Sequence, residues 1–220
     1  MERVLPEIPY DEVLHYLASK EVDERTVVQI YRAIDKVKQL AKPKIVYQIA
    51  TLEGCENTLG IPLHGHDIEE LLASCDQAVF MAATLGSAVD TEVKRLSIRD
   101  MGDMLIFDAV CNAAIEAVAD VFQEELRVKF QGQGRYLSDR FSCGYGDLSI
   151  SIQKRFCEAL DTQRKIGLFV NASSLLIPLK SITAIIGISK EKQQKRISGC
   201  EYCDLKDTCL LRKEGMRCGK

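Results

Sequence analysis

The residue types with the clearest capacity for chemistry lie in one short stretch, Arg140-Phe-Ser-Cys143-Gly144-Tyr145. An arginine carries a planar guanidinium that grips a carboxylate through two parallel hydrogen bonds. The glycine lets the backbone approach a ligand closely, and the tyrosine supplies a flat face and a hydroxyl. This spacing suits a small ligand with an amino-acid end and a ring, although an ordinary turn has a similar composition. Cys143 is a further candidate for the wall of such a site.

A second chemical signal is the cysteine cluster at the C-terminus, Cys200-x2-Cys203-x5-Cys209-x8-Cys218. Four thiolates at these spacings form a complete ligand shell for tetrahedral zinc or for a 4Fe–4S cluster. Both metals fit, and we favour iron–sulfur slightly because a cluster can pass an electron. The alternative is a set of unligated thiols in a flexible tail.

The other cysteines and the histidines give no comparable pattern. Cys111 and Cys157 fall within predicted helices, where a cysteine is typically a small core residue. His15, His64 and His66 form no recognisable catalytic triad or metal motif. We interpret His64-Gly-His66 as a polar turn, with metal ligation as the alternative. The sequence therefore predicts no protein acid, base or nucleophile.

Regular elements must position these residues, and hydrophobic periodicity predicts where they lie. The N-terminus is expected to form an extended piece and a short helix. Asp23 is expected to cap the helix that follows it. Gly86 is expected to end a buried strand before the next helix begins. Residues 135–147 read as a strand and a loop. The remaining helices are predicted at 24–41, 68–73, 87–99, 104–129 and 151–160, and the strands at 44–52, 58–63, 78–85, 166–170 and 182–188.

The order of these elements predicts the fold class. Strands and helices do not alternate regularly, which disfavours a doubly wound parallel sheet. The pattern favours an α+β fold in which helices pack on a mostly antiparallel twisted sheet. After Ser189 the composition changes abruptly to a charged linker and then the cysteines. We therefore expect one domain over residues 1–189 and a small Cys-rich metal module over residues 190–220.

Composition narrows the function classes. Hydrophobic residues make up 46% and charged residues 28% of the 220 residues, with a formal net charge of -3. A nucleic-acid partner would favour a basic surface, so this balance argues against one. The longest apolar runs have the length of a strand, well short of a membrane span. No apolar leader is visible, and we expect a cytoplasmic protein with reduced cysteines.

Several stretches together carry a resemblance to a known family. The chain resembles the activation (reactivation) domain of cobalamin (vitamin B12)-dependent methionine synthase. Besides the Arg-x-x-x-Gly-Tyr segment, residues 82–90, 108–120 and 178–187 match the family pattern, in the right order. The resemblance covers roughly residues 45–189.

The resemblance implies a ligand and its contacts. In the family, the Arg-x-x-x-Gly-Tyr segment binds S-adenosylmethionine. By that correspondence Arg140 would hold the ligand's carboxylate, and Gly144 and Tyr145 would lie along the bound molecule. Glu116 matches a helical glutamate that faces the site in the family. The segment before Arg140 lacks the acidic residue of the family, and Asp11 is the only candidate for its N-terminal aspartate.

The resemblance also implies a role. Oxidation strands a corrinoid methyltransferase as cob(II)alamin, and rescue needs one electron and one methyl group from S-adenosylmethionine. This chain has no corrinoid-binding Asp-x-His-x-x-Gly pattern, so cobalamin would be carried by a partner. The expected partner is a corrinoid-binding protein or a short methionine synthase lacking its own activation domain, with a flavodoxin or ferredoxin as reductant.

Two other hypotheses stay open at this point. The chain is an adaptor that docks on a corrinoid protein without binding S-adenosylmethionine, which the missing acidic contacts favour. Or it is an iron–sulfur electron carrier for corrinoid proteins, which the cysteine tail favours. Binding of S-adenosylmethionine would distinguish the reactivation hypothesis from the other two. A redox-active absorption band would distinguish the electron carrier from the adaptor.

Overall fold

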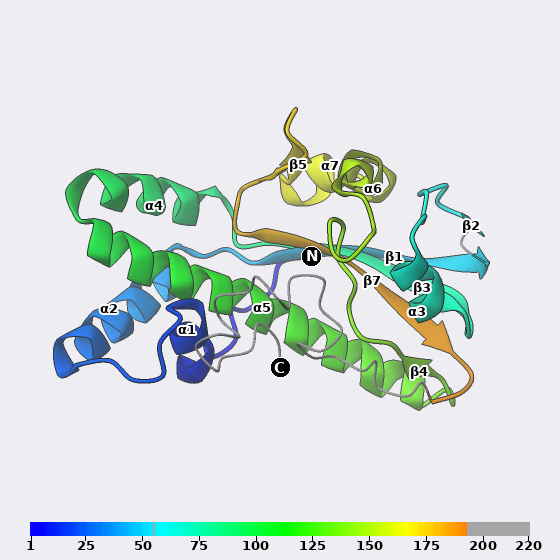
Figure 1. Cartoon of the computed structure of the whole chain (residues 1–220), viewed down its shortest axis with the longest axis horizontal. Coiled ribbons are helices and arrows are strands. Elements are labelled where there is room, and N and C mark those ends of the chain that lie inside the picture. The colour runs from blue at the N-terminus through cyan, green and yellow to red at the C-terminus, as the bar shows by residue number, and fades with distance from the viewer. Residues whose placement is uncertain (55, 193–220) are drawn as a thin grey trace.

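The longest uninterrupted apolar run of the sequence forms the centre of the main sheet in the computed structural model, which describes residues 1–54 and 56–192. This run, residues 78–83, lies within β3 (Cys75–Thr84), which pairs along its length with β1 (Lys44–Glu53) on one side and β7 (Ser181–Ser189) on the other. Two short strands, β2 (Glu56–Asn57) and β4 (Tyr136–Leu137), complete the order β2-β1-β3-β7-β4. Every pairing is antiparallel (Figure 1).

β3 is buried on both faces, and its alternating side chains divide between two hydrophobic cores. Val79, Met81 and Ala83 belong to one core. Ala78, Phe80 and Ala82 belong to the other. An apolar run without alternation is the pattern expected of a strand covered on both sides.

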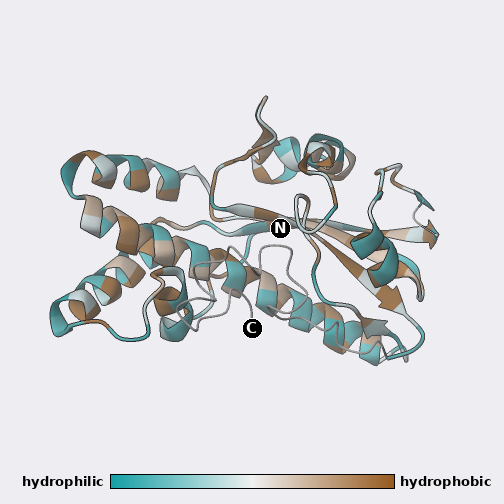
Figure 2. Ribbon diagram, viewed as in Figure 1, coloured by the Kyte–Doolittle hydropathy of each residue, from teal (hydrophilic) through white to brown (hydrophobic). Residues whose placement is uncertain are grey.

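The first core lies under a layer of long helices. The 31-residue α5 (Met101–Gln131) runs along the sheet, with α1 (Tyr10–Tyr16), α2 (Glu24–Leu40) and α4 (Ser87–Arg99) packed around it. Carboxylates cap two of these helices: Asp23 accepts from Thr26 N at 2.7 Å, and Asp100 accepts from Asp103 N at 3.0 Å. Figure 2 shows apolar and polar residues interspersed along α2 and α5, as expected of helices with one face buried.

The second core lies under short elements on the opposite face. These are α3 (His66–Leu72), the 3₁₀ turn η1 (Ile150–Ile152), α6 (Gln153–Leu160), α7 (Thr162–Ile166) and a hairpin of β5 (Phe169–Val170) with β6 (Leu176–Ile177). Phe156 of α6 packs on Phe80 of β3 with ring centroids 5.7 Å apart. The predicted α+β class with a mostly antiparallel sheet is thereby confirmed.

Of two predicted strands, one does not form and the other forms only in part. Residues 58–63 form a turn and extended chain. The Asn57 side chain bonds to Ile61 O (2.7 Å) and Ile61 N (3.2 Å), so these two backbone groups are satisfied without a partner strand. Of the predicted strand 166–170 only β5 forms, because Ile166 ends α7 and Gly167 adopts a left-handed φ of 72°.

The outer edge of β7 is only partly covered. β4 pairs with Ser189 and Ile188 alone. Further along, Phe141 and Ile185 exchange backbone hydrogen bonds of 2.9 and 2.8 Å. Between these pairings, Ser138 N donates to Gly187 O (3.0 Å) and Ser138 Oγ accepts from Gly187 N (2.8 Å), so the segment through Phe141 is tied to the sheet edge at several points. Among the described helices, none is both long enough and apolar enough to cross a membrane.

Candidate functional site

Strand alternation decides where Arg140 points. Its neighbour Phe141 is bridged to β7 and turns its ring into the second core, where it is 2% exposed. Successive side chains of an extended backbone point to opposite faces. Arg140 therefore leaves on the other face, toward α5, and its side chain is 18% exposed.

Three side chains of α5 hold the Arg140 guanidinium. Nη2 donates to Glu116 Oε2 at 2.8 Å and lies 2.8 Å from Asp120 Oδ1. Nη1 donates to Gln123 Oε1 at 2.9 Å. The three α5 residues are spaced i, i+4 and i+7, which places them on one helix face. We name this group of four residues the Arg140 cluster.

The charges of the cluster act on a tyrosine of α1. Burial, together with the carboxylates of Glu116 and Glu12, raises the pKa of Tyr16 to about 12, while Arg140 acts in the opposite direction. The Tyr16 phenol therefore stays protonated at neutral pH and available as a hydrogen-bond donor. With two carboxylates and one guanidinium, the cluster itself is net acidic.

The remaining predicted loop residues lie on the other side of the sheet edge. Tyr145 is 67% exposed, and its ring meets Phe141 edge-on with centroids 5.6 Å apart. Gly144 has φ +84°, and a Cβ there would lie 2.9 Å from Ile150 Cδ1, so both backbone and packing require glycine. The structure thus brings Arg140 and Glu116 into direct contact, with Tyr145 on a separate exposed tip of the same loop.

Cys143 lies away from the Arg140 cluster. Its side chain is in the second core, 8% exposed, and burial raises the pKa of its thiol to about 11. At neutral pH this sulfur is a protonated core group. Asp11, in the first turn of α1, is exposed.

Sequence reasoning missed Asp120, Gln123 and Tyr16 as members or neighbours of the site. A signal for two of them was present, since Asp120 and Gln123 continue the helical spacing from Glu116. The stripe extends in the other direction to Asn112 and Asp108, which bind Lys180 Nζ at 2.8 and 2.6 Å. Polar residues at four-residue intervals thus follow one side of α5.

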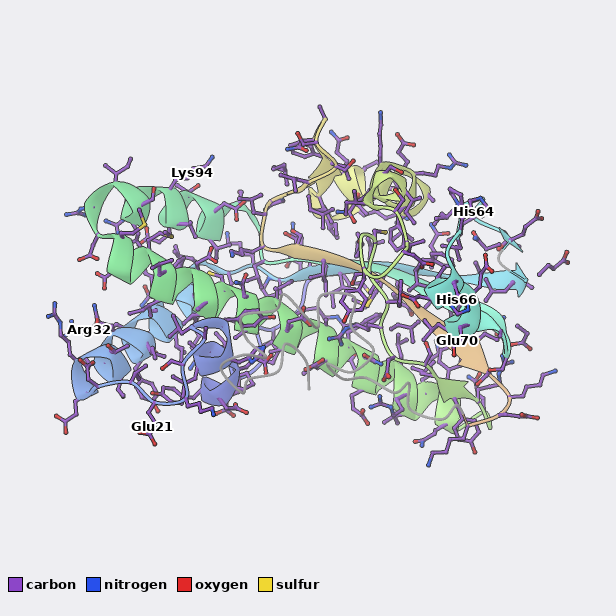
Figure 3. The ribbon with its side chains drawn as sticks, in the orientation of Figure 1. Glu21, Arg32, His64, His66, Glu70 and Lys94 are labelled. Atoms are coloured by element: carbon purple, nitrogen blue, oxygen red, sulfur yellow. The ribbon has the colours of Figure 1, made fainter. Side chains whose placement is uncertain are left out.

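Within residues 1–54 and 56–192, no group of three or more His, Cys, Asp or Glu side chains has the arrangement to hold a metal ion. His64 lies shortly before α3 and His66 is the first residue of that helix (Figure 3). Both side chains are exposed, as expected of a polar turn. The predicted metal ligands Cys200, Cys203, Cys209 and Cys218 lie outside the described residues.

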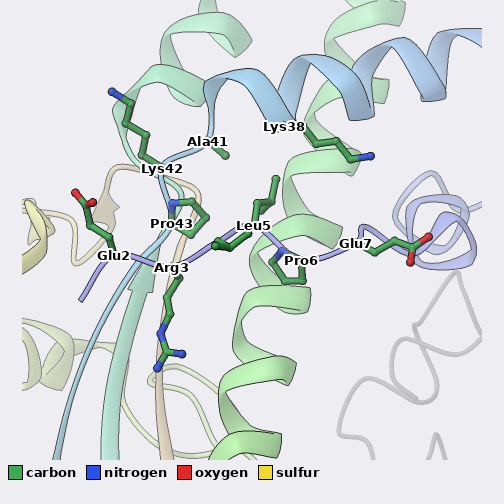
Figure 4. Close-up of a pocket in the computed structure, with 10 residues that line it drawn as sticks. Glu2, Arg3, Leu5, Pro6, Glu7, Lys38, Ala41, Lys42 and Pro43 are labelled. Carbon is green, nitrogen blue, oxygen red and sulfur yellow. The ribbon is translucent and has the colours of Figure 1, made fainter.

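A large open groove lies at a different place. Its volume is about 810 Å³, and it runs between the N-terminal segment and the end of α2 (Figure 4). Arg3 lines it, but this guanidinium is directed to Glu125 on α5 with bonds of 2.6 and 2.7 Å. None of the predicted site residues lines this groove.

Similarity to known proteins is found in the fold and not in the sequence. No protein-family model matches the chain, and no curated protein sequence matches it. Among solved structures, it is similar to the MetH reactivation domain bound to AdoHcy, with a TM-score of 0.58 and 14% sequence identity. That similarity covers 96% of this chain and 78% of the other. This chain therefore has the fold of the MetH reactivation domain.

Proposed function

We propose that this chain binds S-adenosylmethionine at the Arg140 cluster and serves the reductive reactivation of a cobalamin-dependent methyltransferase of the methionine synthase type. The observation that carries the proposal is the placement of Arg140. It stands beside two carboxylates at a sheet edge, on the fold of a domain whose structure is described as bound to AdoHcy.

The charges of the cluster suit the amino-acid end of such a ligand. A zwitterion needs a cation for its carboxylate and an anion for its ammonium, and the cluster holds both. A guanidinium has five N–H donors, and the partners Gln123, Glu116 and Asp120 engage Arg140. Asp120 is the more exposed carboxylate, at 48% against 34% for Glu116. We propose that the ligand's carboxylate replaces Asp120 on Nη2, which frees Asp120 for the ligand's ammonium.

The chemistry asks little of the protein besides position. The proposed reaction adds one electron to cob(II)alamin on the partner and then transfers the sulfonium methyl to the resulting cob(I)alamin, leaving S-adenosylhomocysteine. No side chain of this chain needs to exchange a proton in it. Holding the methyl donor in a fixed orientation lowers the barrier through proximity. As the family resemblance implies, Gly144 and Tyr145 would lie along the rest of the ligand, which would extend from Arg140 past the sheet edge to reach them.

The partner and the electron donor follow from this proposal. We propose a corrinoid-binding protein or a short methionine synthase as partner, and a flavodoxin or ferredoxin as donor. A zinc ion or 4Fe–4S cluster in the C-terminal cysteines stays a prediction, as does the division at residue 189. The four described free cysteines, Cys75, Cys111, Cys143 and Cys157, are compatible with the reducing cytoplasm in which we propose the protein works.

Calorimetric titration of S-adenosylmethionine and S-adenosylhomocysteine into anaerobically purified protein tests the proposal. Arg140→Ala should weaken binding by about tenfold or more, since a charge-assisted carboxylate contact is worth about 1.5–3 kcal/mol. Arg127→Ala is the matched control, because Arg127 of α5 also pairs with an acidic α5 residue, Glu124, but on the exposed surface of the helix. It should leave the affinity unchanged.

If the intact protein binds neither compound, alone and again with a corrinoid protein present, the reactivation proposal is wrong. A docking or electron-transfer role would then remain, and the absorption spectrum of the anaerobic protein would separate these two.

A further inference from the structure

The loop that begins at Arg140 has an exposed tip, which is hydrogen-bonded to a segment distant in the sequence. The loop comprises residues 140–148, and its tip, residues 144–147, is exposed. Within the loop, short backbone bonds shape the tip: Gly144 N donates to Leu148 O (2.9 Å) and Tyr145 N donates to Ser142 O (3.1 Å). These bonds set its local form but do not fix where the tip lies relative to the domain.

Asp147 makes the connection to the domain. Its carboxylate accepts from His66 N at 2.6 Å and from Asp67 N at 3.3 Å, and so caps α3 from 80 residues away. A carboxylate at the first turn of a helix also interacts favourably with the helix dipole. α3 is itself anchored in the second core through Ile68, Leu71 and Leu72.

Two glycines allow the close approach. A Cβ on Gly65 would lie 2.5 Å from Asp147 Oδ1, and a Cβ on Gly146 would overlap the carboxylate of Asp67. Each glycine thus faces the carboxylate of the opposite segment. We name the four residues Gly65, Asp67, Gly146 and Asp147 the α3 latch.

We propose that Asp147 is a positioning residue for ligand binding: through the α3 latch it fixes the tip of the loop, and with it Tyr145, relative to Arg140. Arg140 is held from the α5 side and the tip from the α3 side, so the two ends of the loop are fixed independently. This inference rests on the proposed function, because it assigns to the latch the placement of a ligand-contacting side chain.

Hydrogen exchange of the ligand-free protein tests the latch itself. Asp147→Ala should raise amide exchange in peptides covering 142–148 and 65–69. Asp23→Ala is the matched control, since Asp23 caps α2 with a bond of similar length, 2.7 Å to Thr26 N, away from the loop. It should leave both peptides unchanged. Unchanged loop exchange in Asp147→Ala would overturn the proposal.

A second pair of variants reaches the latch from its glycine side. Gly146→Ala should reproduce the exchange pattern of Asp147→Ala, because the added methyl displaces the tip from Asp67. Gly134→Ala is its control, as Gly134 also has a positive φ, +67°, but no atom within 4 Å of the added Cβ. A loop unaffected by Gly146→Ala, or equally affected by Gly134→Ala, would contradict the latch.

Ligand affinity then tests positioning. Asp147→Ala should weaken S-adenosylhomocysteine binding by about tenfold, the scale of one lost capping interaction. Asp147→Asn, whose amide oxygen still accepts from His66 N, should recover most of it. Adding Tyr145→Ala to Asp147→Ala should cause no further loss, since the tyrosine is then already misplaced. Independent, additive losses would overturn the positioning role.

The two proposals fail in different ways. Protein that binds neither adenosyl compound but shows the expected exchange changes would refute the proposed function and leave only the latch. Protein that binds with the Arg140 dependence, while Asp147→Ala has wild-type affinity, would refute the positioning role alone. Asp23→Ala should lower unfolding stability about as much as Asp147→Ala without altering affinity, which excludes general destabilisation as the cause.

Discussion

Replacing Arg140 by methionine should destabilise the domain by leaving its carboxylate neighbours without a cation. Methionine keeps much of the apolar stem of arginine, so the change isolates the guanidinium. In the folded protein, Glu116 and Asp120 would then face each other one helical turn apart, and Gln123 would lose its hydrogen-bond donor. Like charges at i, i+4 repel, and the repulsion adds to the lost bonds.

The size of the effect follows from the exposure of the partners. A hydrogen bond to a charged group contributes about 1.5–3 kcal/mol when the group is shielded from water. Glu116 and Asp120 are 34% and 48% exposed, so solvent screens much of each contact. We expect a loss of about 2 kcal/mol in the free energy of unfolding. In a domain of this size that corresponds to a fall in Tm of about 4–8 °C.

Urea and thermal unfolding of three variants measures it. Arg140→Met should lose about 2 kcal/mol, and the double variant Arg140→Met/Glu116→Gln should regain about 1 kcal/mol by removing one uncompensated carboxylate. Arg127→Met, which breaks the exposed pair with Glu124, should cost about 0.5 kcal/mol or less. Unchanged stability in Arg140→Met, or a further loss on adding Glu116→Gln, would refute the reasoning.

Three further variants probe packing, a buried bond and a titration. Gly187→Ala should cost about 1–3 kcal/mol in urea unfolding, because the new Cβ would lie 2.5 Å from Cys75 Sγ; adding Cys75→Ala should relieve part of the loss. Thr183→Val removes the 2.9 Å bond to buried Gln153 and should cost about 1–2 kcal/mol, and a neutral result would contradict this. Burial and neighbouring carboxylates raise the pKa of Tyr16 from 10.0 to about 12, so its contribution to stability is present below pH 10 and is lost as pH rises to about 12. Tyr16→Phe should show a smaller fall in stability over that window.

Much of the fold followed from local signals in the sequence. The helix predicted at 87–99 forms with those bounds, and the strands predicted at 78–85 and 182–188 form with ends shifted by a few residues. The long helix begins three residues earlier than the expected position 104, because the Asp100 carboxylate caps it through Asp103 N. The predicted strand at 58–63, which does not form, shows the limit of periodicity. Ile61 and Leu63 are buried as the pattern indicates, but the backbone of Ile61 bonds to the Asn57 side chain and not to a partner strand.

The candidate site, like the fold, could be predicted from the sequence only in part. Arg140, Gly144 and Tyr145 were predicted from their residue types and spacing together with the family resemblance, and Glu116 from the resemblance alone. The structure brings Arg140 and Glu116 within 2.8 Å. The sequence did not determine in which direction these side chains point. Whether Glu116 faces the loop depends on how α5 is rotated against the sheet. The contact of Asp147 with α3 spans 80 residues, and no local pattern of spacing reports such a pairing.

The double-sided burial of β3 has a consequence for how this domain melts. Its even-numbered residues 78, 80 and 82 complete one core and its odd-numbered residues 79, 81 and 83 complete the other. A slip of one residue would exchange the two sets, placing Phe80 where an alanine or valine now fits and opening a void opposite. Neither half can reach its packing while the other is unformed, so the two layers should lose structure in one cooperative transition. A ligand bound at the loop would then stabilise both layers against global unfolding by the same free energy.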